Sequence, residues 1–248
     1  MKNYQAPQDL LKGRVILITG AGQGIGKTAA LTFAAHGATV ILHGRSVKKL
    51  EAVYDEIDTA GHPQPAIFPL DLNKAEDKDF AAMAAGIGGQ LGRLDGILHN
   101  AAKIDRPQPL EDQTLAQWLP LLRVNLAAPF ALTRACLPLL KASPDASILM
   151  TSETHGHTPT AFWGGFAVAK SGVETLVKIW AQELEVYPTL RINAVVPGPV
   201  QSPQRIRTYP GERKDSLPKP ETLMPLYLYL MGPDSRGASG QIIEANRG

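Results

Sequence analysis

One short segment of the chain concentrates side chains that can move protons. Glu153, His155 and His157 lie close together, and the apolar residues Trp163 and Phe166 follow them. A histidine is the usual general acid near neutral pH, and a glutamate in a partly apolar pocket can also donate a proton. The alternative interpretation is that both histidines are solvent-exposed loop residues. A second alternative is a metal site, because these residue types also bind metal ions.

A glycine-rich turn provides the other chemical signal. It follows the apolar run 15–19 and precedes a helix whose inward residues are expected to include Ala29 and Phe33. Glycines allow a tight turn and let the backbone amides of a helix N-terminus approach a pyrophosphate. We therefore expect a dinucleotide site here; the alternative is a glycine turn that binds no ligand. The expected contacts are Gly20, Gly22, Gln23, Gly24, Ile25 and Gly26.

Short apolar runs recur along the chain and predict the strands that would position these groups. The runs lack alternation between apolar and polar residues, as expected for strands buried on both faces. They are Arg14–Thr19, Thr39–His43, Ala66–Leu70, Gly96–His99, Ser147–Thr151, Arg191–Val196 and Gln241–Ile243.

The stretches between these runs have helical periodicity, and repeated β-α-β units predict a parallel sheet with helices on both sides. We expect an α/β fold in three layers, a doubly wound, seven-stranded parallel sheet, with residues 1–248 forming one domain. The expected helical faces are Val47, Leu50, Tyr54 and Ile57; Leu115, Leu119, Leu122 and Leu126; and Val173, Leu176, Val177, Trp180 and Leu184.

The composition excludes several classes of protein. Hydrophobic residues make up 44% and charged residues 19% of 248 residues, which permits a large core. A net charge of +2 is too small to indicate a nucleic-acid partner. No stretch approaches the roughly 18 apolar residues of a membrane span, and residues 1–7 lack the apolar core of a signal peptide. Cys136 is the only cysteine, so no internal disulfide forms, which favours a reducing cytoplasm.

The segment 197–220 differs from its surroundings, because it is rich in proline and in basic residues. We expect a loop with short helices lying over the strand ends, the edge at which open α/β sheets bind ligands. This segment is therefore either a lid on the substrate side or a solvated surface loop.

The spacing Thr-Gly-x-x-x-Gly-Ile-Gly at residues 19–26 resembles the short-chain dehydrogenase/reductase family. The opening at 8–11 and the tail at 224–232 look like one bacterial subgroup, the YciK-like oxidoreductases. Other family motifs are matched along nearly the whole chain by Asp71, His99-Asn100-Ala101-Ala102, Asn125, Lys170 and Pro197-Gly198-Pro199-Val200.

The resemblance implies a Rossmann-like domain that binds a nicotinamide dinucleotide. It places Asp71 beside the adenine, Lys170 on the nicotinamide ribose and the turn at Pro197 near the nicotinamide. It implies no metal, and it implies a homo-oligomer, a tetramer or dimer paired through the helices that contain 115–140 and 168–184. The further cofactor contacts that it implies are Asp71, Leu72, Asn100, Ala101, Lys170, Pro197, Gly198 and Val200.

Two catalytic positions of the family hold other residues in this chain. The family has a tyrosine four residues before the lysine, where this chain has Phe166, whose ring can neither donate nor accept a proton. The family has a serine 13 positions before that tyrosine, where this chain has Glu153. Ser152 is adjacent, but consecutive strand residues point to opposite faces, so only a bulge would bring it into the site. Asn125 and Lys170 match the other two catalytic positions.

The end of the second predicted strand indicates which dinucleotide binds. Members of the short-chain dehydrogenase/reductase family that prefer NAD usually carry an acidic residue at the position of Gly44. Its absence removes repulsion against a 2′-phosphate, and Arg45 is placed to clamp one. We therefore expect NADP(H) to be favoured over NAD(H); the alternative is that Arg45 only stacks on the adenine.

Asn125 also has an argument of its own. Pro129 lies four residues later in the same predicted helix and has no N–H group, so the carbonyl of Asn125 loses its helical donor. A free carbonyl at this point can hold a water molecule, which is the use that the family makes of this asparagine. The alternative is an incidental proline kink.

These observations leave two functions open. The first is an oxidoreductase that transfers hydride to or from a carbonyl or alcohol substrate, with Glu153 or His155 replacing the missing acid and Ser152 retained as a further candidate. The second is an inactive relative, a pseudoenzyme that keeps the cofactor site for a regulatory or scaffolding role.

Overall fold

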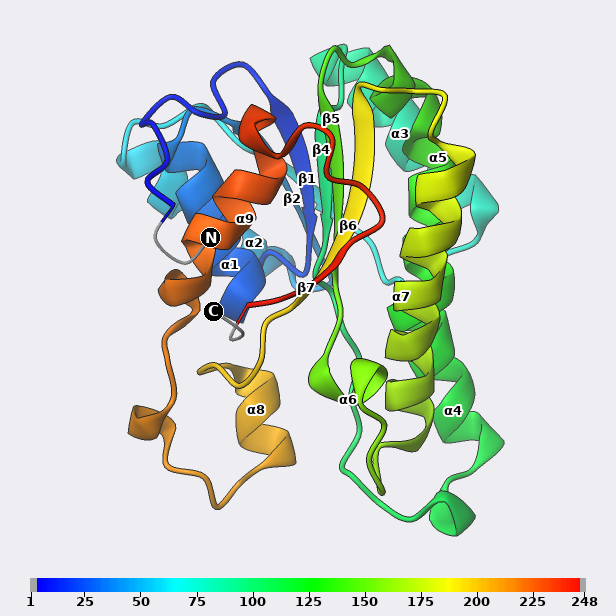
Figure 1. The fold of residues 1–248 in the computed structure, drawn as a ribbon. Coiled ribbons are helices and arrows are strands. Elements are labelled where there is room, and N and C mark those ends of the chain that lie inside the picture. Colours follow the sequence, from blue (N-terminus) through cyan, green and yellow to red (C-terminus); the bar gives the residue numbers. More distant parts are fainter. Residues whose placement is uncertain (1–3, 246–248) are drawn as a thin grey trace.

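The computed structural model describes residues 4–245, and its parallel strands form one seven-stranded sheet in the order β3-β2-β1-β4-β5-β6-β7 (Figure 1). The order runs outward from β1 in both directions, so the strand ends diverge between β1 and β4. Ligands of doubly wound sheets bind at such a point. The strands are β1 (Val15–Thr19), β2 (Thr39–Gly44), β3 (Ala66–Pro69), β4 (Gly96–His99), β5 (Ala146–Thr151), β6 (Leu190–Val196) and β7 (Ile242–Glu244).

The predicted strands are confirmed to within one residue at each end. β1, β4 and β6 are buried along their whole length, as their continuous apolar sequence requires. The register aligns Thr19 of β1 with His43 of β2 and with His99 of β4. Because β1 is central, residues just after these strands meet at one edge of the sheet.

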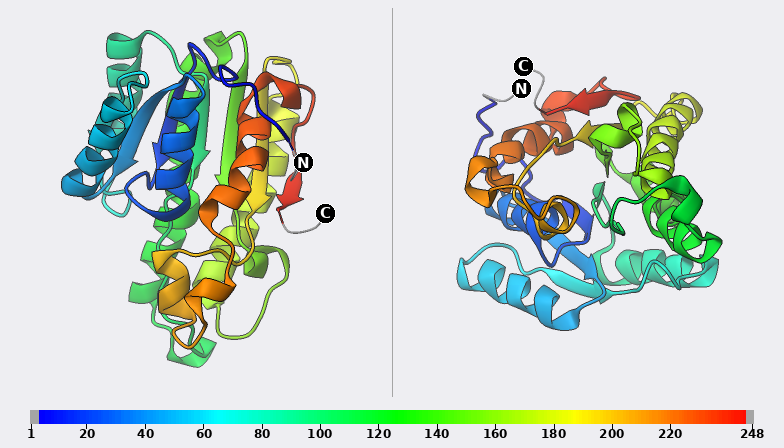
Figure 2. Two further views of the ribbon diagram at one scale, coloured as in Figure 1. Left: turned by 90° about the vertical axis from the view of Figure 1, so that its left-hand side faces the viewer. Right: turned by 90° about the horizontal axis from the view of Figure 1, so that it is seen from below.

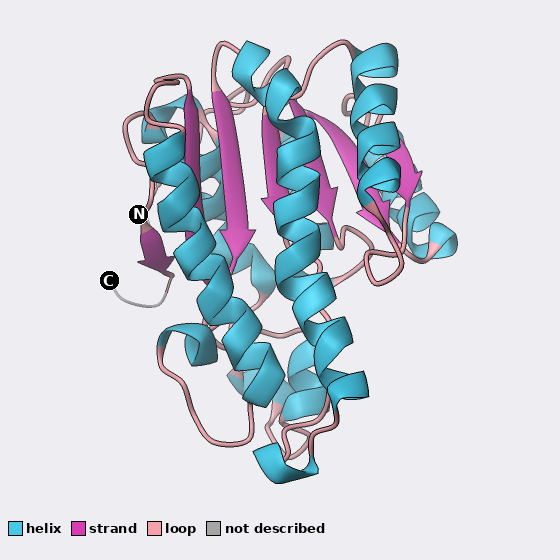
Figure 3. Cartoon of the chain, turned by 90° about the vertical axis from the view of Figure 1, so that its right-hand side faces the viewer, coloured by secondary structure: helices cyan, strands magenta, loops and turns pink. Residues whose placement is uncertain are grey.

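Helices cover both faces of the sheet, as predicted from the β-α-β pattern. Figure 3 shows α3, α5 and α7 side by side on one face, and α1, α2 and α9 pack on the other. The helices are α1 (Gly24–Ala35), α2 (Val47–Thr59), α3 (Asp77–Leu91), α4 (Leu115–Leu122), α5 (Ala128–Ala142), α6 (Thr154–His157), α7 (Gly164–Glu183), α8 (Pro203–Thr208) and α9 (Met224–Met231).

Two apolar layers hold the helices to the sheet. On one face, Phe33 of α1, Leu50 of α2 and Tyr227 of α9 pack against β1 and β5. On the other face, Leu132 of α5 and Val177 of α7 belong to the second layer. The strand ends are therefore fixed from both sides, which gives the site at that edge a rigid floor.

The predicted helical faces are correct for α2 and α7 but not for α4. The faces of α2 and α7 are largely buried, although Val47 is exposed. On α4, Leu115 and Leu119 are 71% and 54% exposed, and it is Leu121 that packs inward. The leucine spacing was helical, but sequence periodicity does not say which of two apolar faces meets the sheet.

The segment 197–220 forms the predicted loop with short helices. α8 lies below the strand ends in Figure 1, and two 3₁₀ turns, Lys214–Ser216 and Pro220–Leu223, follow it. Within residues 4–245, no helix is long and apolar enough to cross a bilayer.

Candidate functional site

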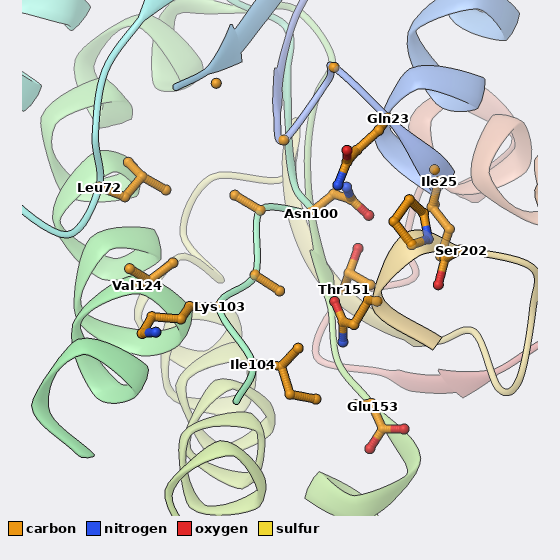
Figure 4. Close-up of a pocket in the computed structure, with 18 of the residues that line it drawn as sticks. Gln23, Ile25, Leu72, Asn100, Lys103, Ile104, Val124, Thr151, Glu153 and Ser202 are labelled. Atoms are coloured by element: carbon orange, nitrogen blue, oxygen red, sulfur yellow. The ribbon is translucent and has the colours of Figure 1, made fainter. Parts of the chain in front are cut away.

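A cleft of about 620 Å³ lies at the carboxyl ends of the strands (Figure 4). Its lining comes from the turn after β1, the ends of β2 and β3, the loop after β4, the end of β5, α7 and the segment after β6. Gln23 lies toward one end and Glu153 toward the other. The cleft therefore joins the glycine-rich turn to the segment of titratable residues.

Glycine is required at two positions of the turn. Gly20 has φ +71°, and a Cβ there would lie 2.9 Å from Cα of Ala101. A Cβ at Gly26 would collide with the carbonyl group of Gly20. The first turn of α1 follows directly and contains no acidic residue, so its free N–H groups favour an anion. This cradle fits a pyrophosphate.

Thr19 ties the turn to the loop after β4. Its Oγ1 accepts the backbone N–H groups of Asn100 and Ala101, each at 3.0 Å. The two loops that line the middle of the cleft are thereby held at one spacing. Thr19 begins the glycine motif in the sequence, but this role of its hydroxyl was not predicted.

Basic and polar residues gather at the end of the cleft formed by β2 and β3. Arg45 and Lys49 both line it, and Lys49 Nζ donates to Oε1 of Gln23 at 2.5 Å. Asp71 Oδ1 accepts the backbone N–H of Asn73 at 3.1 Å, which shapes the loop after β3. Lys49 is a second cation beside Arg45 that the sequence analysis did not identify.

Asn125 positions the loop after β4 and does not itself line the cleft. Its amide donates to the carbonyls of Lys103 at 2.7 Å and Leu121 at 2.9 Å, and its Oδ1 accepts the N–H of Lys103. Here the chain forms a π-helical turn, Arg123–Ala127, between α4 and α5. This wide turn replaces the single continuous helix that was predicted, and it lies where Pro129 cannot donate to Asn125.

Lys170 of α7 is buried at the centre of the cleft wall. Its ammonium donates to the carbonyl oxygen of Thr151 at 2.6 Å. Burial lowers the pKa of Lys170 to about 8, while the charge of Glu153 acts in the opposite direction. Thr151, a residue that the sequence analysis did not identify, therefore fixes Lys170 at the end of β5.

The wall next to Lys170 is aromatic. Phe166 and Trp163 line the cleft, and their ring centroids are 5.9 Å apart. The ammonium of Lys170 lies 5.8 Å from the centroid of the Phe166 ring. Phe166 thus presents a ring face without a polar atom one helical turn before the lysine.

Glu153 lines the cleft and caps the short helix α6. Its Oε2 accepts the backbone N–H of His155 at 2.6 Å. Within residues 4–245 it forms no ion pair, although its charge reaches Lys170. Glu153 is therefore the acidic group at this end of the cleft.

Ser152 and His155 have other partners. The hydroxyl of Ser152 donates to Oε1 of the buried Glu174 at 2.7 Å, and His157 contacts the second oxygen of Glu174 at 3.1 Å. The ring of His155 stacks on Trp163 with centroids 3.9 Å apart and does not line the cleft. Burial lowers the pKa of His155, the charge of Glu153 opposes this shift, and the charge of Arg205 adds to it. His155 is therefore a partly buried residue that packs on Trp163, whereas His157 is exposed.

The segment 197–220 bridges the two sides of the cleft. At its start, Ser202 and Pro203 lie against the turn, since a Cβ on Gly24 would be 3.7 Å from Cδ of Pro203. Seen from below in Figure 2, α8 crosses the end of α1. Directly after α8, the Tyr209 hydroxyl lies 3.3 Å from Nε2 of His155.

The cleft brings together most of the residues predicted from the sequence. Gly26, Asn125 and His155 lie behind its surface. Within the described part of the chain, no group of three or more His, Cys, Asp and Glu side chains is arranged to hold a metal. The predicted residues that line the cleft are Gly20, Gly22, Gln23, Gly24, Ile25, Arg45, Asp71, Leu72, Asn100, Ala101, Ser152, Glu153, Phe166, Lys170, Pro197, Gly198 and Val200.

The sequence of this chain matches known oxidoreductases over most of its length. The family model for short chain dehydrogenases matches residues 14–212. The uncharacterized oxidoreductase YciK of Escherichia coli K12 is 40% identical over 246 residues, which cover 99% of this chain and 97% of YciK.

Solved structures agree with these matches over the full fold. A structure from Pseudomonas syringae, described as a short chain dehydrogenase, is 46% identical with a TM-score of 0.96, covering 98% of this chain and 99% of that one. Another, from Escherichia coli CFT073 and solved in complex with NADPH, is 40% identical with a TM-score of 0.94, covering 97% and 99%.

Proposed function

This chain belongs to the short chain dehydrogenase family, and from that premise we propose an NADP(H)-dependent oxidoreductase that works with an altered set of polar side chains. Residues 1–248 act as one domain, with 197–220 as its substrate-side segment. When bound, the nicotinamide supplies or accepts a hydride. The residues of this chain bind it, orient it and supply the polar contacts to the substrate.

The cleft supports dinucleotide binding because of its glycine cradle. The pyrophosphate takes the N–H groups at the start of α1, where Gly20 and Gly26 leave no room for a Cβ. Asp71 and Leu72 contact the adenine, Lys170 contacts the ribose next to the nicotinamide, and the loop at Pro197 contacts the nicotinamide.

A preference for NADP(H) is supported by the cations at the end of β2. Arg45 and Lys49 line the cleft, and position 44, where NAD-binding members carry an acidic residue, holds glycine. Two cations stabilise a 2′-phosphate through charge-assisted hydrogen bonds. The relative from Escherichia coli CFT073 was solved with NADPH.

The altered chemistry rests on one observation: the ring of Phe166 lies beside Lys170 on the cleft wall. A phenyl ring cannot protonate an alkoxide. Glu153 is the acidic side chain at the substrate end, whereas Ser152 and His155 are held by other groups. We assign the polar contact with the substrate to Glu153. Asn125 positions the loop after β4, and Lys170 positions the ribose of the cofactor.

The test has two stages. Calorimetric titration with NADPH, NADP⁺, NADH and NAD⁺ measures binding, and no response at millimolar concentration would remove the cofactor assignment. The loaded protein is then given a panel of small ketones, imines and quinones. Glu153→Gln is expected to lower turnover sharply with cofactor affinity unchanged, whereas His155→Gln is expected to change turnover little.

The second candidate is a non-catalytic protein that keeps its cofactor site. Phe166 and Trp163 favour it, because both are almost fully buried and leave the substrate end poor in hydrogen-bond donors. Tight NADPH binding with no turnover on the panel would support this candidate over the oxidoreductase.

We also propose a homo-oligomer, a tetramer or dimer, in the cytoplasm. Leu115 and Leu119 of α4, Val168 and Ile179 of α7, and Phe130 of α5 are exposed, and these three helices lie on the same side of the sheet (Figure 1). A patch of this kind is typical of a subunit interface. Light scattering at micromolar concentration tests this, and a monomer would contradict it.

A further inference from the structure

The charges at the substrate end of the cleft are arranged differently from those of a site for carbonyl reduction. Reduction of a ketone places negative charge on oxygen, and hydrogen-bond donors must stabilise it. Here Phe166 offers no donor, and Glu153 in its ionised form is an acceptor only. A developing alkoxide would be repelled by Glu153 and would find no proton at Phe166.

The other cations at this end are held by oxygen acceptors. Lys103 Nζ donates to Asp105 at 2.9 Å, and Arg205 binds both carboxylate oxygens of Glu212 at 2.6 and 2.8 Å. Lys170 is held on the Thr151 carbonyl. Burial lowers the pKa of His155, and the charge of Glu153 opposes this shift.

The side chains around Glu153 can stabilise a positive charge. Trp163 and Phe166 line the cleft, and aromatic rings attract positive charge at their faces through their quadrupoles. Glu153 uses one oxygen, Oε2, for the N–H of His155, and no described side chain or backbone group forms a hydrogen bond to Oε1. One carboxylate oxygen and two aromatic rings therefore belong to the same cleft wall as Lys170.

We propose that the substrate is a protonated imine, with Glu153 as the carboxylate that binds its nitrogen. This inference rests on the proposed function and names the substrate class. Reduction then balances without a proton donor: a hydride forms a C–H bond at the carbon, the π electron pair of the C=N bond moves to nitrogen, and a neutral amine results while NADPH becomes NADP⁺. The replacement of both a donor serine and a donor tyrosine follows, because no alkoxide forms.

The activity test compares 3,4-dihydroisoquinoline with 1-tetralone, a bicyclic ketone of similar size, using NADPH. The imine is expected to be reduced at least ~10-fold faster, and Glu153→Gln is expected to lower kcat/KM for it by roughly 10- to 100-fold, the value of a hydrogen bond to a charged group. Glu185→Gln, an exposed glutamate remote from the cleft, is the matched control.

A binding test does not depend on turnover. Calorimetry with the product amine 1,2,3,4-tetrahydroisoquinoline, protonated at pH 7, should detect binding to the protein loaded with NADP⁺. Isochroman, its neutral oxygen analogue, should bind at least ~10-fold more weakly, and Glu153→Gln should remove the difference.

The outcomes distinguish failure of the imine assignment from failure of the proposed oxidoreductase function. Reduction of the ketone but not of the imine would overturn this inference and leave the proposed oxidoreductase standing. Bound NADPH with neither substrate reduced, and no preference for the amine over isochroman, would overturn both. Amine preference that survives Glu153→Gln would overturn the role of Glu153.

Discussion

The hydroxyl of Ser152 donates a 2.7 Å hydrogen bond to Glu174, a buried carboxylate of α7. The serine adjacent to the family's catalytic position thus acts within the protein core. Its neighbour Glu153 lines the cleft with a carboxylate that has no ion pair among the residues that the structure describes.

Ser152→Ala is therefore expected to affect stability and not turnover. Loss of a hydrogen bond to a buried carboxylate costs about 1–3 kcal/mol in the free energy of unfolding. Urea denaturation measures that cost, and turnover of the loaded protein should stay within about 3-fold of the parent, well inside the effect of a lost catalytic group. A large loss of turnover with unchanged stability would instead place Ser152 on the substrate.

Phe166→Tyr combined with Glu153→Ser should rebuild the family's standard set around Asn125 and Lys170. The phenol would lie beside Lys170, whose ammonium is 5.8 Å from the present ring centroid. A restored general acid should raise ketone reduction by ~10²-fold or more, measured as NADPH oxidation. Phe130→Tyr, on the exposed side of α5, controls for the added hydroxyl. No gain in the double variant would mean that the cleft no longer holds a ketone in reach.

Arg45→Ala should lower the affinity for NADPH by roughly 10-fold or more and leave the affinity for NADH unchanged, because a charge-assisted contact with the 2′-phosphate is lost. Calorimetry at two salt concentrations measures both affinities. Lys12→Ala, at an exposed position outside the cleft, is the control for net charge. Equal losses for both cofactors would indicate that Arg45 stacks on the adenine instead.

His43 should make the protein less stable in mild acid. Burial lowers the pKa of His43 from 6.5 to about 4, and neither ring nitrogen has a hydrogen-bond partner within residues 4–245. The folded state therefore holds His43 neutral, and its stabilising effect is complete above pH 6.5 and is lost as pH falls toward 4.

The size of this effect follows from the shift. Between pH 7 and pH 5 the loss attributable to His43 is about 2 kcal/mol, at 1.36 kcal/mol per pKa unit. Urea unfolding of the parent and of His43→Leu at both pH values measures it, and the leucine variant should lose less by that amount. Equal losses in both proteins would show that other groups set the acid sensitivity.

The fold was predictable because its signals are local. Buried parallel strands are continuous apolar runs, and Gly20–Gly26 lies between a strand and a helix as a phosphate-binding turn requires. The positions of Phe166 and Lys170 on one side of α7 follow from helical spacing alone.

The features that the sequence did not reveal are contacts between residues far apart in the chain. Ser152 is engaged by Glu174, 22 residues away, and His155 stacks on Trp163 behind the cleft. Leu115 and Leu119 have helical spacing, but they are exposed, and Leu121 is the residue of α4 that is buried. Lys49 was missed because its role depends on α2 returning beside the glycine turn.

The bridge formed by 197–220 has a kinetic consequence. Pro203 rests on Gly24 and Tyr209 contacts His155, so the segment spans both the glycine turn and the aromatic wall. Ser202, Pro203 and Thr208 line the cleft between these two contacts. We therefore expect the two contacts to slow the release of a bound nucleotide, so that weakening either one raises its dissociation rate.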